Sequence, residues 1–186
     1  LNNTLNVVAN SDVLLCVISG STTVTVPEGF ELLYEIPSIE SSLTTSRQYL
    51  RIYKKHITTA EKISITITQE SQNKAFNFFA CNILNANNYI IGQIINQNIE
   101  AEEVNTVNVI KSSTNAIIIS HQIYAHDDTV INAYNPSENC LLFDANNRGH
   151  YIIDKSSETS HELSLKSASG SIYPYQIWQT VVLNIS

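Results

Sequence analysis

The densest group of potential metal-binding or catalytic side chains lies in residues 121–128, which read His-Gln-Ile-Tyr-Ala-His-Asp-Asp. Histidine and carboxylate groups are common ligands of catalytic zinc. In an extended strand, however, His121 and His126 have opposite parity and project from opposite faces. Asp127 and Asp128 suit a loop, where aspartate bonds to nearby backbone. We therefore predict no metal site and no bound cofactor.

Other catalytic arrangements have little support. The Gly-x-Ser-x-Gly turn of many serine hydrolases does not occur. Cys140 follows a turn and His150 comes ten residues later, but nothing fixes a third group beside them. A carboxylate pair for glycoside cleavage is defined by distance in space, so the sequence leaves it open, although acids such as Glu102 and Glu103 sit in links where solvation is usual. We predict no catalytic residue and a protein that is not an enzyme.

The best candidate for ligand binding is the aromatic segment 173–178, which reads Tyr-Pro-Tyr-Gln-Ile-Trp. Tyr173 and Tyr175 share one face of a strand and could stack on a pyranose ring, because they lie near a loop. Trp178 takes the other face and suits the core. Hydrogen bonds to such a ligand are expected from the loop residues Asn146, Asn147 and Arg148.

The three cysteines match no zinc-binding or redox spacing. Cys16 and Cys81 lie within apolar runs, so we predict buried, unreactive thiols. A bridge between these two stays open if the chain matures in an oxidising compartment.

Composition limits the partners. The chain has 186 residues, 43% hydrophobic and only 15% charged, against about a quarter charged in ordinary proteins. Asn, Ser, Thr and Gln must therefore cover much of the surface, which suits contact with carbohydrate or with like subunits. A genome rich in A and T is the alternative explanation for the many Asn and Ile residues.

Charge and hydropathy exclude two further classes. The net charge is −7, and the ten Lys and Arg residues do not cluster beyond Arg51, Lys54 and Lys55, which we interpret as a solvated strand edge. We therefore predict no nucleic-acid partner. No apolar run approaches eighteen residues, so we predict no membrane span.

The elements that must position these residues are strands. Residues 63–68 alternate between apolar and hydroxyl side chains, as in a strand with one buried face. The apolar runs 13–18 and 116–119 suit strands in the centre of a sandwich. The stretch 89–99 is ambiguous, because its apolar residues could form a helical stripe, whereas Gly92, the many Asn residues and the β-branched Ile disfavour a helix. We interpret it as the irregular connection between the halves, with at most one helical turn, and place the boundary near residues 85–105. Residues 104–110 then restart the sheet.

An internal repeat organises these strands. Residues 26–35 and 135–144 each hold a Pro-led turn, a double-Leu strand, an aromatic residue and an acid, and residues 76–83 resemble 178–185 at an offset of 102. We expect Pro27 at the second position of its turn. The prediction is an all-β, jelly-roll-like sandwich of two antiparallel sheets. It comprises an N-terminal arm (1–10) and a single domain (11–186) with half-repeats at about 11–84 and 105–186.

Five segments in order carry a family resemblance: Asp12–Leu15, the turn Val26–Phe30, Leu50–Lys55, Thr59–Glu61 and Phe76–Cys81. Together they resemble the β-sandwich modules of bacteriophage and prophage minor tail and tail-fibre proteins. The likeness covers roughly residues 11–186.

The chain departs from that pattern at two turns. The usual Gly-Trp is Gly29-Phe30 here, and Asn139 stands where the second half would have glycine. Asn tolerates a positive φ, so a tight second turn stays compatible with the pattern.

The resemblance implies a non-enzymatic module of a virion or surface appendage, extracellular or in the virion. Such a module would form homo-oligomers with like subunits and bind host-surface carbohydrate. The alternative is a structural subunit of a capsid decoration, fibre or secreted filament. It would assemble by strand exchange through residues 1–10, where Leu1, Leu5 and Val7 form the assembly arm. The chain contains no Met, so we expect a processed or excised piece.

Overall fold

The structure is a computed structural model that describes residues 2–37, 48–70, 76–100, 104–124, 140–144, 149–155, 157–166 and 175–186. The chain divides into two compact units, unit 1 (Leu1–Ala86) and unit 2 (Asn87–Ser186). Every regular element in the described ranges is a β-strand, and the paired strands are antiparallel. The prediction of an all-β protein with antiparallel sheets is therefore confirmed. Within the same ranges, no helix is long and apolar enough to span a membrane.

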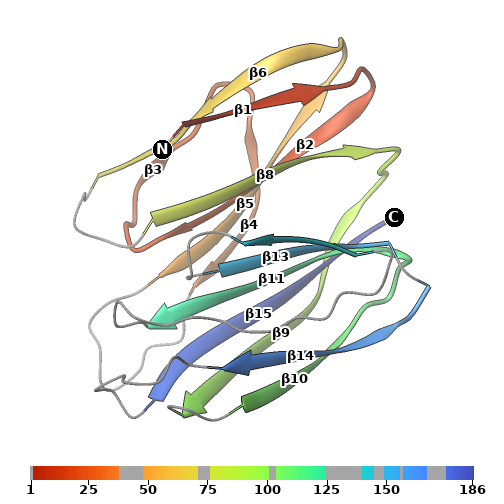
Figure 1. The fold of residues 1–186 in the computed structure, drawn as a ribbon. Coiled ribbons are helices and arrows are strands. Elements are labelled where there is room, and N and C mark those ends of the chain that lie inside the picture. The colour runs from red at the N-terminus through yellow and green to blue at the C-terminus, as the bar shows by residue number, and fades with distance from the viewer. Residues whose placement is uncertain are drawn as a thin grey trace. The chain divides into compact units, whose positions relative to one another are not determined.

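Unit 1 contains one larger sheet and two strand pairs (Figure 1). The larger sheet has the order β4-β5-β2-β8, while β1 pairs with β6 and β3 pairs with β7. The strands are β1 (Asn2–Val7), β2 (Ser11–Ser19), β3 (Val24–Thr25), β4 (Glu31–Pro37), β5 (Tyr49–Ile57), β6 (Glu61–Thr66), β7 (Thr68–Gln69) and β8 (Phe76–Leu84).

Unit 2 contains a five-stranded sheet of order β12-β13-β11-β15-β9 and the pair β10-β14, whose ribbons run side by side in Figure 1. The strands are β9 (Tyr89–Glu100), β10 (Val104–Ile110), β11 (Asn115–Tyr124), β12 (Cys140–Asp144), β13 (Gly149–Asp154), β14 (Ser160–Lys166) and β15 (Tyr175–Ile185).

The two units share a pairing order. The order β4-β5-β2-β8 of unit 1 corresponds to β12-β13-β11-β15 of unit 2, and the pair β1-β6 corresponds to β10-β14. Unit 2 adds β9 beside β15, whereas no described strand pairs with the outer edge of β8. A shared order is what the predicted repeat requires, but the repeat itself and the jelly-roll connectivity stay predictions.

The core of unit 1 lies between the larger sheet and the β1-β6 pair. Alternate residues of β2 (Val13, Leu15 and Val17) pack with Ile63 and Ile65 of β6. The side chains of β6 alternate between buried and exposed along Ile63–Thr66, so the predicted alternation is confirmed there. All nine residues of β2 are buried, as expected for a central apolar strand.

The core of unit 2 is built in the same way from both of its sheets. Val107 and Val109 of β10 pack with Ala116 and Ile118 of β11, and Trp178 and Val182 of β15 join them. Trp178 is only 2% exposed, which confirms its predicted place in the core.

Three sequence-based expectations were wrong. Residues 89–100 form strand β9, not an irregular connection, because their side chains alternate about an interruption at Gly92. Phe30 N donates to Pro27 O at 3.5 Å, so Pro27 holds the first position of its turn. Gly29 holds the third, with the positive φ of 85° that favours glycine there.

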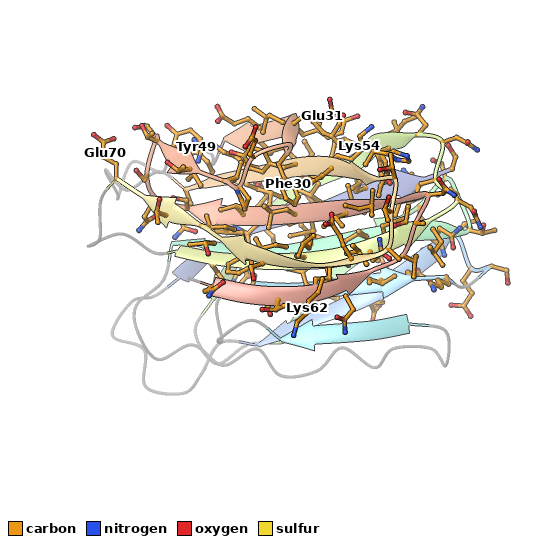
Figure 2. All side chains as sticks on the ribbon, turned by 90° about the horizontal axis from the view of Figure 1, so that it is seen from above. Phe30, Glu31, Tyr49, Lys54, Lys62 and Glu70 are labelled. Carbon is orange, nitrogen blue, oxygen red and sulfur yellow. The ribbon has the colours of Figure 1, made fainter. Side chains whose placement is uncertain are left out.

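The third error concerns Arg51, which was predicted to be solvated but is 4% exposed. Its Nε donates to Glu35 Oε2 at 2.6 Å, and its other nitrogens donate to the carbonyls of Ser21 and Thr22. The guanidinium therefore holds the turn after β2 against β4. Lys54 does lie at the surface, where it pairs with Glu31 at 3.1 Å (Figure 2).

Asparagine side chains accept hydrogen bonds from backbone N–H groups at several strand edges. Asn3 Oδ1 accepts a hydrogen bond from Thr4 N in β1, Asn77 Oδ1 accepts one from Phe78 N in β8, and Asn88 Oδ1 accepts one from Tyr89 N. Unpaired N–H groups on an edge invite further strands. Each of these side chains satisfies the amide of the next residue.

The thiols of Cys16 and Cys81 are free and buried. Cys81 lies opposite Leu14, so the two cysteines are diagonal neighbours, about 7–8 Å apart. That spacing exceeds the reach of a disulfide. Burial raises the pKa of Cys81 to about 12, and burial, with a smaller contribution from Cys81, raises the pKa of Cys16 well above 9.0.

These pKa shifts make stability depend on pH. The free energy of unfolding keeps its full value below about pH 9 and falls above it, because only the unfolded thiols ionise there. Each thiol contributes a slope of at most about 1.4 kcal/mol per pH unit. We expect urea unfolding at about pH 8 and about pH 10.5 to show a smaller loss in Cys81→Ala than in wild type. An equal loss would contradict the buried thiol.

Candidate functional site

A small pocket in unit 2 lies where β9, β15 and the turn after β10 meet. Its volume is about 260 Å³, and it is lined by Gly92, Gln93, Ile110, Ser112 and Asn184. Pockets for drug-sized ligands measure about 300–1,000 Å³. This pocket therefore suits a single small group or one end of a larger ligand.

A β-bulge shapes the wall of the pocket. Gln93 lies opposite Val182 and Ile91 lies opposite Leu183, so Gly92 is an extra residue in β9. A Cβ at Gly92 would lie 2.1 Å from Asn184 Nδ2, closer than any real contact. The residue is glycine because Asn184 occupies the space of a side chain.

Amide side chains hold the rest of the wall. Gln93 Oε1 accepts a hydrogen bond from Ile110 N at 2.8 Å, and Asn184 Oδ1 accepts one from Ser112 N at 2.8 Å. These bonds join the end of β10 and the turn after it to the five-stranded sheet. Asn184 Nδ2 is buried and has no hydrogen-bond partner among the described residues.

The described lining of this pocket is uncharged. None of the five described residues that line it carries an ionisable side chain. Ile110 is 58% exposed, and Ile90, which lies opposite Asn184 in the strand pairing, is 51% exposed. The site therefore combines hydroxyl and amide groups with an apolar rim. Among the described residues, no group of three or more His, Cys, Asp or Glu side chains could hold a metal ion.

Unit 1 has a related arrangement without the bulge. Asn82 Oδ1 accepts a hydrogen bond from Val8 N, and its Nδ2 donates to Ser11 Oγ at 2.6 Å and to Asp12 O at 3.0 Å. Asn82 and Asn184 are separated by the same 102 positions as the similar sequence segments. Asn82 joins the last described strand of unit 1 to the turn between β1 and β2, and Asn184 joins the last described strand of unit 2 to the turn between β10 and β11.

Most of the sequence-predicted ligand-binding residues lie outside the described residues. These are Tyr173, Asn146, Asn147 and Arg148. Tyr175 begins β15 and pairs with Glu100, but the structure does not describe its side chain. The prediction that they form one site stays a prediction.

The predicted assembly arm is a strand of unit 1. Residues 2–7 form β1, in which Asn2 pairs with Thr66 and Val7 with Glu61. Val7 is buried and Leu5 packs against the same core, while Leu1 lies outside the described residues.

His121 from the first cluster is fully buried in β11. Its Nε2 lies 3.0 Å from Gln179 Oε1. Residues 126–128 lie outside the described residues, so the prediction about this cluster stays a prediction.

The pocket was not among the sites predicted from the sequence. Gly92 was used only as an argument against a helix, although glycine within a strand often marks a bulge or a close approach. Asn184 was matched to Asn82 within the repeat, but nothing in the pattern assigned either amide a role.

No family model, no curated protein and no solved structure matches this chain.

The contact between Gly92 and Asn184 can be tested with a double-mutant cycle. Gly92→Ala should force Asn184 away from Ser112 and cost about 1–3 kcal/mol of unfolding free energy. In an Asn184→Ala background the new methyl group has room, so the same change should cost much less. Urea unfolding of the four proteins measures this coupling, and additive losses would show that the two residues are independent.

Proposed function

We propose that this chain is a non-enzymatic binding and assembly module of a phage or prophage tail, in the virion or outside the cell. Its unit 2 pocket takes one sugar residue of a host-surface glycan. The family resemblance of the strand and turn motifs supports the first part. The pocket supports the second.

The observation that carries the carbohydrate proposal is the mixed lining of the pocket. Sugar rings present hydroxyl groups at their rim and C–H groups on their faces. Ser112 and Gln93 line the pocket with polar groups, and the exposed Ile110 offers an apolar surface. The low charge of the chain, 15% of residues, is also compatible with a neutral ligand.

A glycan array tests the proposal. Wild type should bind a restricted set of glycans, and Ile110→Ser should lose at least about tenfold in affinity, because one apolar contact is worth about 1–3 kcal/mol. Leu32→Ser is the matched control, since Leu32 is 51% exposed but lies in unit 1. The absence of any glycan binding would contradict the proposal.

The same array separates the pocket from the sequence-predicted aromatic site. Tyr173→Ala and Tyr175→Ala should retain binding if the pocket is the sugar site. Binding that survives Ile110→Ser but is lost in the two tyrosine variants would move the site to the segment 173–178.

Assembly by strand exchange is the second candidate, and the pairing of β1 favours it. β1 pairs with β6 in a two-stranded sheet, and it continues into β2 through a short turn that includes Asn10 at a φ of 56°. The β1 of one copy could therefore pair with the β6 of the next and extend an assembly.

A disulfide lock tests strand exchange without deleting β1, whose Val7 belongs to the core. Thr4 and Ser64 are exposed and lie opposite each other, so cysteines there can bridge β1 to its own β6. In a Cys140→Ala background, the oxidised Thr4→Cys/Ser64→Cys protein should stay monomeric in size-exclusion chromatography. The reduced protein should assemble as wild type does. Assembly that persists in the oxidised protein would rule out exchange through β1.

A further inference from the structure

The shared strand order leaves one position unmatched. In unit 2, β9 pairs with the outer edge of β15 over eleven residue pairs, from Tyr175–Glu100 to Ile185–Tyr89. In unit 1, β8 takes the place of β15 in the order, and no described strand pairs with its outer edge. Among the described strands, the larger sheet of unit 1 therefore ends one strand earlier than that of unit 2.

The outer edge of β8 has backbone groups available for another strand. Phe78 N donates to Asn77 Oδ1, so it points away from the neighbouring strand β2. N–H groups alternate in direction along an antiparallel strand, so those of Ala80 and Asn82 also point outward. The side chain of Asn77 occupies the outward N–H group of Phe78, at one end of the edge. Among the described residues, the outward N–H groups of the segment 80–84 have no such side-chain acceptor.

The side chains of β8 would also fit beside a strand that resembles β9. Tyr89, Ile91 and Ile94 of β9 lie opposite Ile185, Leu183 and Val181. At the repeat offset of 102, those three residues of β15 correspond to Ile83, Cys81 and Phe79 of β8. Phe79 and Cys81 are buried, so a new strand with apolar residues at alternate positions would continue an apolar row.

We propose that the outer edge of β8 is a docking site for an extended strand from a partner chain. The strand is antiparallel to β8 and carries apolar side chains at alternate positions, as β9 does. Main-chain hydrogen bonds would supply the affinity, and the row of apolar side chains the specificity. This interaction requires neither carbohydrate nor exchange of β1, so it is separate from both functions proposed above.

The test uses the whole chain and a synthetic peptide with the sequence of residues 88–100. Hydrogen exchange should slow about tenfold at the amides of Ala80 and Asn82 when the peptide saturates, because each gains a hydrogen bond. Two versions of the peptide, N-methylated at odd or at even positions, should differ, since only one set of amides faces β8. Unchanged exchange at both amides, or equal binding of the two versions, would overturn the proposal.

A variant of β8 gives an independent measurement. Ala80→Pro removes an outward N–H without removing a hydrogen bond to β2, a position where an edge strand tolerates proline. It should abolish peptide binding while urea unfolding stays cooperative, and if it does not fold, the N-methylated peptides decide alone. A peptide that only displaces β9 from β15, leaving the β8 amides unchanged, would also refute the proposal.

Discussion

Each unit depends on a central strand whose side chains are buried on both faces. β2 is buried along all nine residues, and β11 is buried from Ala116 to His121. Both strands also have a hydrogen-bonded neighbour on each side, so their backbone groups are satisfied within the sheet. Polar residues in such a strand need partners near its ends. Ser11 donates to Val8 O, and Ser19 donates to Gln69 Oε1.

The last strand of the shared order is joined by an asparagine to a nearby turn, which lies between β1 and β2 in unit 1 and between β10 and β11 in unit 2. Asn82 does this with three hydrogen bonds, whereas Asn184 makes one and leaves its Nδ2 against Gly92. In unit 2 the bulge of β9 places Gly92 against Asn184 Nδ2, and Asn184 forms part of the wall of the pocket.

Much of the fold could be predicted because its strands have simple patterns. The segment 63–66 alternates in burial, and the runs 13–18 and 116–119 are central strands, as periodicity indicated. β9 was missed because its isoleucines at 90, 91, 94 and 95 are spaced as on a helix. The bulge at Gly92 shifts the alternation by one residue, and a single sequence does not reveal such a shift.

The pocket could not be predicted for a different reason. Gly92 and Asn184 are far apart in sequence, and their contact exists only once β9 has paired with β15 in one register. The burial of Arg51 also depends on tertiary structure, because the carbonyls of Ser21 and Thr22 reach it only through a turn. Patterns along the chain predict which residues are apolar on one face. They do not predict which polar groups meet.

The asparagines beside Thr4, Phe78 and Tyr89 affect how readily copies of the chain associate through their sheet edges. Proteins commonly keep sheets from sticking together with lysine, whose repulsion weakens as electrolyte is added. A neutral amide blocks a backbone donor by occupying it, and this does not depend on electrolyte or on protonation. A chain with few charges can in this way stay dispersed across solvents that would screen a lysine-protected surface.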